Sequence, residues 1–461
     1  MRWLSTLVPF RDAVAQFRTG DLSPRDYLEQ AIEQIMRAEP ALNVFAHLDL
    51  ANARRLADAS AQRYRAGTSL SPIDGMPIGI KDIIETADMP TAMGSEIYLG
   101  WQPRADAACV QAVRQGGGVP LGKTRSTEFA IGRATTTCNP HDGDRTPGGS
   151  SSGTAAGVAS GMFSAGLGTQ TQGSIVRPAS FCGVVGYKPT WGALSLHGVH
   201  PVSASHDHLG VIADSLDSCW RLAWWIAQQA SNPLRAGLSG RPGTVLQPRP
   251  VHRLAVLRTC GYAELDDAEL AVFESKLEAW RASGVDVVEP SQDAALAIFC
   301  AEAEKMGEAS MDMVAHEMRW PYRSYVERSG PLVSEKIHSL LRRGEAVDRH
   351  RYAQLLQTRL ALRERAQALG ETYDAFVLPA ASGVAPQGLD NTGSRTLLVY
   401  SSFLGLPACS LPLLQINSLP LGMQLMGFHN ADYRLLCHAQ WLMHGADAHR
   451  KPPGDRHGFV N

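Results

Sequence analysis

Apolar positions recur along this chain with two different periods, and stretches of the two kinds alternate. Helical spacing follows Ser23, a residue type that caps helices, and lasts until Pro40; a second helical pattern covers residues 50–66. Beyond them, short apolar stretches bounded by glycine, such as residues 77–80 and 119–122, are typical of buried strands. The first third of the chain therefore predicts helices followed by a sheet.

The second half repeats this alternation. Two apolar stretches, residues 254–257 and 285–288, flank a helical pattern over 266–282, which predicts a βαβ unit. A long helical stretch over 332–368 precedes another buried strand at 375–378. We therefore predict an α/β fold in which helices cover both faces of a central mixed β-sheet, with a helical segment at the N-terminus.

One large domain over residues 67–461 is expected, because no repeat or low-complexity tract divides it. We expect residues 1–66 to pack on it as a helical segment. The domain then comprises a core that carries the motifs, a variable helical region, a C-terminal part of the core and a polar tail: residues 75–220, about 290–370, 371–447 and 448–461.

Composition and charge exclude several classes of protein. Apolar residues make up 44% and charged residues 19% of the 461 positions, as in ordinary globular proteins. The 43 basic and 45 acidic side chains leave a formal charge of -2, so no positive field favours a nucleic acid partner. No apolar stretch reaches the roughly 18 to 20 residues of a membrane span, and the first residues lack the features of a secretory signal.

The eight cysteines are scattered, with no CxxC pair and no histidine at metal-binding spacing. This pattern favours neither a zinc site nor a disulfide framework, and it predicts a reducing compartment, the cytoplasm. The chain also has a histidine cluster, formed by His197, His200, His206 and His208, whose acidic neighbour is Asp207. We interpret these histidines as loop residues and predict no metal site.

Two glycine-rich strings match catalytic motifs of other folds. Residues 117–124, GGVPLGKT, fit the phosphate-binding P-loop, but they follow a helical pattern instead of a buried strand. Residues 149–153, GSSSG, fit the nucleophile elbow of α/β-hydrolases, with Ser151 as nucleophile and Asp207 and His208 as its partners. The stretch upstream of this second string is a loop, whereas an elbow requires a strand. Both motifs therefore stay minor alternatives.

Lys81, Ser150 and Ser174 form a more specific constellation. Lys81 directly follows an apolar strand, and burial there favours the neutral amine, which can act as a base. Ser150 lies in a loop that runs into a helix of small residues, and Ser174 follows a tight turn around Gly173 whose backbone amides can receive a developing oxyanion. Each residue also has a purely structural explanation: an ion pair with Asp82 for the lysine, and a helix cap or a turn for the serines.

With its neighbours, this constellation resembles the amidase signature family over most of the chain. The matching stretches include GMPIGIKD at 75–82, NPHDGDRTPGGSSSG at 139–153, GTQTQGSIVRPAS at 168–180 and LPLGMQLMG at 419–427. They occur in the family's order and with its Lys-to-Ser and Ser-to-Ser spacings. The resemblance implies the amidase signature fold, and it explains the P-loop match, because a GKT-like string is common at that place in the family.

The resemblance also implies catalytic roles. Ser174 matches the nucleophile, Ser150 the bridging serine held in a cis peptide bond, and Lys81 the base. Protons would move from Ser174 through Ser150 to neutral Lys81, and then to the departing nitrogen. Backbone N–H groups of the turn would form the oxyanion hole, and two hydroxyl residues would support the triad. These residues are Thr171, Gln172, Gly173 and Ser174 for the hole, and Ser151 and Thr169 as supporting residues.

The chain departs from the family pattern at three positions. It has Gln170 where the family usually has an acid, Gln172 where glycine is usual, and Arg177 three positions after the nucleophile instead of two. Gln170 can replace the hydrogen bonds of a carboxylate. Gln172 brings a side chain into the oxyanion loop, and we interpret it as a substrate-binding residue that favours a polar acyl group. The alternative is that it faces away and fills space in the loop.

The resemblance implies an amidohydrolase that cleaves a C–N bond of a small carboxamide or urea-like substrate through an acyl-enzyme and releases ammonia or an amine, without cofactor or metal. The alternative is the glutaminase subunit of a tRNA-dependent amidotransferase; against it, residues 414–418 hold no acid where such subunits often carry one. The expected partners are a small-molecule substrate and a second copy in a homodimer, with no nucleic acid and no membrane. The acyl pocket is expected to include the variable region over 290–345.

Overall fold

A mixed sheet of 11 strands crosses the described part of the protein, residues 2–229, 236–238 and 245–444, in this computed structural model. The strands lie in the order β1-β3-β2-β4-β6-β5-β10-β11-β9-β7-β8. Their bounds are β1 Phe45–Leu48, β2 Pro77–Lys81, β3 Val119–Thr124, β4 Ala165–Gln170, β5 Val185–Lys188, β6 His208–Ala213, β7 Arg253–Val256, β8 Asp286–Val288, β9 Ala375–Pro379, β10 Ala408–Ile416 and β11 Leu419–Met426.

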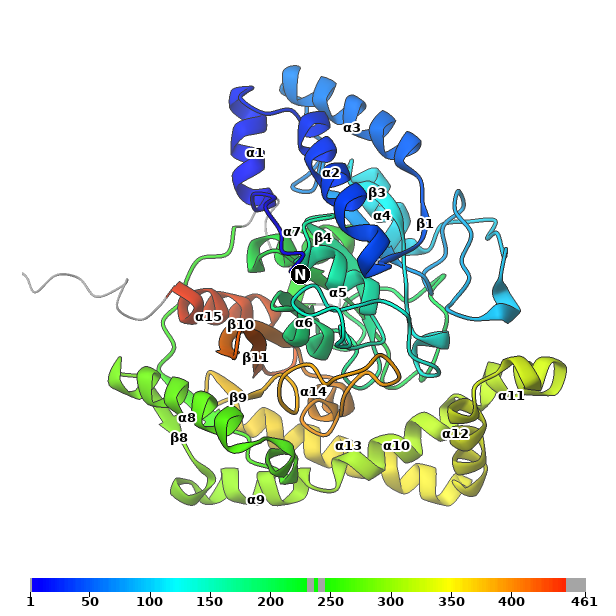
Figure 1. Ribbon diagram of the computed structural model, residues 1–461. Helices are drawn as coiled ribbons and strands as arrows, with labels where there is room; N and C mark the ends of the chain where they lie inside the picture. Colours follow the sequence, from blue (N-terminus) through cyan, green and yellow to red (C-terminus); the bar gives the residue numbers. More distant parts are fainter. Residues whose placement is uncertain (1, 230–235, 239–244, 445–461) are drawn as a thin grey trace, which may run out of the picture.

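Helices surround this sheet, and Figure 1 shows α1 to α3 at one end of the molecule and α9 to α13 at the other, with α5 and α6 between them. Their bounds are α1 Phe10–Thr19, α2 Pro24–Leu42, α3 Leu50–Arg65, α4 Ala108–Gln115, α5 Ser152–Ala159, α6 Val176–Cys182, α7 Leu216–Gln229, α8 Asp267–Ala282, α9 Ala294–Ala303, α10 Met306–Glu317, α11 Arg319–Ser329, α12 Glu335–Ala346, α13 Arg349–Leu369, α14 Val399–Leu404 and α15 Asp432–His444. Among the described residues, no helix combines the length and the apolar character needed to cross a membrane.

The elements agree with the α/β prediction, and most lie within a few residues of the predicted bounds. The hydroxyl of Ser23 accepts a hydrogen bond from the backbone of Asp26 and so caps α2. Strands β7 and β8 are parallel neighbours joined through α8, which is the predicted βαβ unit. The helical stretch over 332–368 is two helices, because Asp348 begins α13 as a cap and interrupts the first one.

The N-terminal segment is less purely helical than the sequence indicated. Between α2 and α3 it contributes β1, which pairs antiparallel with β3 at the edge of the sheet. Phe45 of this strand is buried and packs edge-on against Phe163, with 5.7 Å between ring centroids. The segment is therefore tied to the core by backbone pairing as well as by helix packing. The polar tail, residues 448–461, lies outside the described residues.

Two parallel strands in the interior of the sheet position the site. Strands β2 and β4 run side by side in parallel, so their carboxyl ends meet at one edge. Lys81 ends β2, and Thr169 lies near the end of β4. Helix α5 covers this place closely because its residues are small: a Cβ added to Gly157 would lie 2.3 Å from the ring of Phe163. The fold thus brings the motif segments together at one end of two buried strands.

Candidate active site

Lys81 is fully buried, and its amine contacts hydroxyl groups instead of a carboxylate. Its Nζ donates hydrogen bonds to Ser150 Oγ and to Thr169 Oγ1, each at 2.7 Å. Burial lowers the pKa of Lys81 well below its ordinary value, and the more distant negative charge of Asp207 opposes this effect only in part. The environment therefore favours the neutral amine, the form that can accept a proton from a hydroxyl group.

The alternative explanation of Lys81, an ion pair with Asp82, does not hold. Asp82 lies 3.6 Å from Nζ of Lys123, which comes from the neighbouring strand β3. Burial raises the pKa of Asp82 to about 6 and lowers that of Lys123 to about 8. Lys123 is the lysine of the P-loop-like string, and its Nζ also donates to the carbonyl of Ile84. It is a buried structural residue, and residues 119–124 form a strand instead of a phosphate-binding loop.

Ser150 lies beside Lys81 on a loop of unusual backbone geometry. The peptide bond between Gly149 and Ser150 is cis. The carbonyl of Gly149 accepts a hydrogen bond of 2.6 Å from Nη2 of Arg177. Ser150 is 3% exposed and its Oγ accepts the hydrogen bond from Lys81. Arg177, the residue displaced by one position from the family pattern, thus holds the backbone that carries Ser150.

The loop from Thr171 to Ser174 connects β4 to α6 and presents unpaired backbone amides. None of its four N–H groups donates a hydrogen bond to another described residue. Gly173 is required for close packing, because a Cβ there would lie 2.7 Å from Leu398. The side chain of Thr171 donates to Asp207 at 2.7 Å, which fixes the start of the loop. The geometry is suited to receive an oxyanion beside the hydroxyl of Ser174.

Gln170 holds the end of this loop, where α6 begins. Its Oε1 accepts hydrogen bonds from the backbone N–H groups of Ile175 and Val176, at 2.9 and 3.1 Å, where α6 begins. Its Nε2 donates to Ser402 Oγ at 3.1 Å. An amide oxygen thus makes the contacts that a carboxylate at this position could accept, as the sequence indicated.

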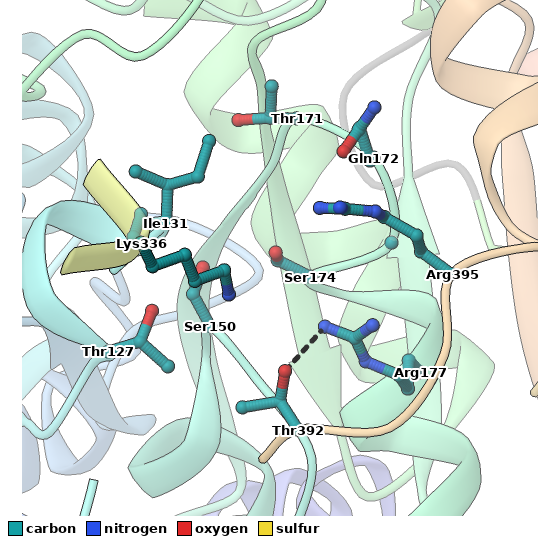
Figure 2. A pocket seen from close by; sticks show the side chains of 12 residues that line it. Thr127, Ile131, Ser150, Thr171, Gln172, Ser174, Arg177, Lys336, Thr392 and Arg395 are labelled. Carbon is teal, nitrogen blue, oxygen red and sulfur yellow. Dashed lines mark hydrogen bonds between the residues drawn. The ribbon is translucent and has the colours of Figure 1, made fainter. Parts of the chain in front are cut away.

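Ser150 and Ser174 line one cavity, and Figure 2 shows both side chains facing the same space. Ser174 is 8% exposed, so its hydroxyl is reachable from the cavity. The hydroxyls of these two serines do not hydrogen-bond to each other in the described structure. The structure therefore joins Lys81 to Ser150 directly, and it brings Ser174 to the same cavity without a direct link; catalytic contacts often tighten only when substrate binds.

The elements of an α/β-hydrolase triad are present but do not come together. The hydroxyl of Ser151 donates to the carbonyl of Thr169 at 3.3 Å, and Asp207 accepts from Thr171. Nδ1 of His208 lies 2.6 Å from the carbonyl of His206. Burial lowers the pKa of both histidines well below the ordinary value. His200 and His206 lie in loops and are hydrogen-bonded, as interpreted, whereas His208 begins β6; all three are buried. The described residues contain no group of three metal-ligating side chains.

Three cations complete the wall of the cavity, and sequence reasoning assigned none of them a binding role. Arg177 comes from α6, Lys336 from α12 and Arg395 from the loop before α14. Figure 2 shows their side chains around the space in front of Ser174. Lys336 belongs to the variable region that was expected to line the pocket. Arg395 ends the polar string DNTGSR, and the position of this string after a buried strand was the one feature of the sequence that could have indicated a binding role for Arg395.

Gln172 lines the cavity with its side chain. Its Nε2 donates to Ser310 Oγ of α10 at 2.8 Å, and Figure 2 shows its oxygen on the side of Ser174. The side chain therefore forms part of the pocket wall, tethered to the variable helical region.

A family model described as Amidase matches residues 26–436. The chain belongs to the amidase signature family. A glutamyl-tRNA(Gln) amidotransferase subunit of Synechococcus sp. (strain CC9902) is 31% identical over 95% of this chain and 96% of its own length. A solved structure described as an amidase gives a TM-score of 0.81 at 28% identity, covering 94% of this chain and 99% of the other. The peptide amidase from Stenotrophomonas maltophilia gives 0.76 at 26% identity, covering 97% and 99%.

These comparisons confirm the predicted family and fold, and they make the chain a hydrolase that acts on C–N bonds of amides. They contradict the prediction about partners. The relative from Synechococcus and one from Symbiobacterium thermophilum, 32% identical over 91% of this chain and 93% of its own length, are named subunits of a tRNA amidotransferase. The prediction of a homodimer with a small-molecule substrate and no nucleic acid is therefore wrong. It relied on net charge, which does not report on a nucleic acid that another subunit would hold.

Proposed function

We propose that this amidase signature enzyme hydrolyses a primary carboxamide at Ser174 and releases ammonia. The observation that carries the proposal is the buried Lys81 bound to Ser150 at 2.7 Å, in a cavity that Ser174 also lines. A lysine with a lowered pKa, a bridging hydroxyl and a second hydroxyl beside free backbone amides supply a base, a proton path, a nucleophile and an oxyanion hole.

The chemistry then follows in two halves. Ser174 Oγ attacks the carbonyl carbon while its proton passes through Ser150 to Lys81, and the loop amides bind the oxyanion. Protonated Lys81 returns the proton through Ser150 to the departing nitrogen, which leaves as ammonia and gives the acyl-enzyme. Water then attacks the acyl-enzyme by the same route, and a carboxylic acid leaves.

Glutamine hydrolysis as part of an amidotransferase is a second candidate function. The relatives with this name match more than nine tenths of the chain, which favours a role in which the ammonia is used by a partner. The lack of an acid in residues 414–418 weighs little against it, because these residues form the end of β10 and the turn to β11 and none of them lines the cavity.

A matched pair of serine substitutions tests the proposed site. We expect Ser174→Ala to abolish ammonia release from any amide that the wild type hydrolyses. Ser151→Ala removes a neighbouring hydroxyl that supports the loop, and we expect it to retain a large part of the activity. The opposite pattern, with Ser151 indispensable and Ser174 dispensable, would assign the nucleophile to the hydrolase-like string.

A substrate panel separates the two candidate functions. Ammonia release is measured from glutamine and from other amides and ureas, with the chain alone and with candidate amidotransferase partners added. Glutamine turnover that depends on the added partners would favour the amidotransferase role. Turnover of other amides by the chain alone would favour an independent amidase.

A further inference from the structure

The space in front of Ser174 is lined by positive charge. Three of its 12 lining residues are cations, Arg177, Lys336 and Arg395, and none is an acid. Figure 2 shows them on two sides of the nucleophile, with Lys336 near Ser150 and the two arginines opposite. They come from three separate elements, α6, α12 and the loop before α14, so the fold gathers them at this place.

These cations have no carboxylate partner among the described residues. Arg177 donates to carbonyls and to one hydroxyl, and its buried Nε has no hydrogen-bond partner. The guanidinium of Arg395 makes no hydrogen bond or ion pair with another described residue, and the acid whose charge acts on it, Glu308, pairs with Arg343. The Nζ of Lys336 donates weakly to the carbonyl of Gly132, at 3.5 Å. The acid whose charge acts on Lys336, Glu128, accepts hydrogen bonds from backbone N–H groups of residues 133 and 334.

A nearby arginine shows the usual arrangement. Arg343 of α12 lies 2.7 Å from both Glu308 and Asp312, so its charge is neutralised within the protein. In the cavity the charges instead oppose one another. Burial and the charge of Arg395 lower the pKa of Arg177 to about 9, and burial with both arginines lowers the pKa of Lys336 to about 8. A bound anion would relieve this repulsion and strengthen its own binding.

We propose that the acyl half of the substrate carries a carboxylate, or an equivalent anion, and no ammonium group. The proposal rests on the proposed amide hydrolysis and adds the chemical class of the amide: a monoamide of a dicarboxylic acid, or a urea that bears a carboxylate. Glutamine meets only half of this description. Its carboxylate fits the cations, whereas its ammonium group would face the same cations, and the cavity in front of Ser174 has no acid to receive it.

A second cavity adjoins the first. It has a volume of about 550 Å³, shares Arg177, Lys336, Thr392 and Arg395 with the first, and has one acid, Asp390, in the part of its wall that the two do not share. The cations thus stand where the two spaces join, between the wider space and Ser174. An anionic acyl group can lie across this junction with its amide carbonyl at the oxyanion loop.

Four amides with the same five-carbon chain test the proposal: glutaramate, glutamine, pentanamide and 5-aminopentanamide. They carry an anion, a zwitterion, no charge and a cation. We expect kcat/KM for ammonia release to be highest for glutaramate and lowest for 5-aminopentanamide. Succinamate against butanamide, and hydantoate against N-propylurea, extend the comparison to a shorter chain and to ureas. The proposal is wrong if the wild type prefers the neutral or cationic amide in the pairs that it hydrolyses. If it prefers glutamine to glutaramate, the part of the proposal that excludes an ammonium group is wrong.

Charge substitutions then locate the preference. Arg395→Gln and Lys336→Gln are expected to lower kcat/KM for glutaramate by about ten- to hundredfold each, the range for loss of a charge-assisted hydrogen bond, and to leave pentanamide nearly unchanged. Arg395→Lys should restore part of the loss. The matched control is Arg342→Gln, which removes a charge from the same helix α12 where it pairs with Glu335 on the surface. Equal losses for both substrates, or a loss in the control, would contradict binding of the anion by these side chains.

The two proposals fail in different ways. If the wild type releases no ammonia from any amide or urea, with or without partner proteins, the proposed hydrolysis itself is wrong. If it hydrolyses amides in a manner that requires Ser174 but shows no preference for anions, the hydrolysis stands and the anionic substrate class is wrong.

Discussion

The floor and the wall of the cavity are built in different ways. The floor consists of β2, β4, α5 and the oxyanion loop, where Lys81, Ser150 and Thr169 are nearly or fully buried and Lys81 donates hydrogen bonds to the other two. The wall consists of α12 and the loop before α14, and it contributes Lys336 and Arg395, whose charged groups are partly desolvated but make no ion pair with another described residue. In the floor, hydrogen bonds join Lys81 to Ser150 and Thr169, and the unpaired groups are the backbone amides of the oxyanion loop. The wall instead presents cations that make no ion pair with another described residue.

This difference suggests that the floor carries out the reaction and that the wall determines which substrate is bound. In the floor, Lys81 holds Ser150 by a hydrogen bond and the free loop amides lie beside Ser174, so a change there alters the proposed proton path or the position of Ser174. In the wall, the cations have no carboxylate to pair with among the described residues. A change there therefore alters which substrate binds. The floor should therefore respond to substitution through kcat for every amide, and the wall through the ratio of kcat/KM values between amides.

Replacing Lys81 should have the largest effect. Lys81→Met keeps an unbranched side chain of similar length and removes the base, so we expect kcat to fall about a thousandfold or more for all amides. In the wild type, kcat/KM should rise with pH as Lys81 loses its proton, because the protonated amine cannot accept one from Ser150. Ammonia release measured across pH checks both expectations, and an activity that rises as pH falls would contradict the role of a neutral lysine.

Lys81→Met removes activity, but it should make the protein more stable relative to the wild type as pH falls. Below the ordinary pKa of lysine, the unfolded chain binds a proton at Lys81 that the folded chain, with its lowered pKa, does not bind. Proton binding therefore favours unfolding. The free energy of unfolding of the wild type should fall relative to that of Lys81→Met as pH decreases from about 10, and the difference should level off below the folded-state pKa. Urea unfolding at several pH values measures this difference, and a constant difference would indicate that Lys81 is charged in the folded protein.

Asp207 is the next most sensitive part of the floor. Its Oδ1 accepts from Thr171 and its Oδ2 from the backbone N–H groups of Val202 and Ser203, at 2.8 and 2.9 Å. An asparagine cannot accept on both sides, so Asp207→Asn should displace the start of the oxyanion loop and lower kcat by about tenfold with little change in KM. Thr171→Val removes the other partner, and the double variant should lose less than the sum of the two single losses. Additive losses would show that the contact does not position the loop.

A smaller effect is expected where floor and wall meet, at Gln172. We expect Gln172→Gly to change the ranking of polar against apolar acyl groups by about fivefold, the effect of one hydrogen bond. Ser310→Ala removes only the tether of the side chain and should produce part of the same change. Competition between two amides in one reaction measures the ranking directly. Wild-type specificity in Gln172→Gly would mean that the side chain only fills space.

The floor could be predicted from the sequence and the wall could not, for a physical reason. Lys81, Ser150 and Ser174 belong to short segments in which glycine and small residues must pack closely, so the local string itself carries the site. Arg395 and Lys336 reach the cavity through the packing of elements that are far apart in the sequence. The polar string before Arg395 and the expected pocket region around Lys336 were the only signals, and neither identifies a binding residue. The β1 strand escaped prediction for a similar reason, because four residues between two helices form a strand only when β3 lies beside them.

The smallest effect is expected at Gln170, the departure from the family pattern that lies deepest in the floor. Its Oε1 already accepts the two N–H groups at the start of α6, and a carboxylate oxygen would accept them equally well. The hydroxyl of Ser402, which now accepts from Nε2, can rotate to donate to the second carboxylate oxygen. The new charge is buried, and the two amides it meets offset that cost in part. We therefore expect Gln170→Glu to change kcat/KM by less than about threefold for anionic and neutral amides alike. A loss confined to anionic amides would show that the floor also takes part in selection, and that the separation from the wall is incomplete.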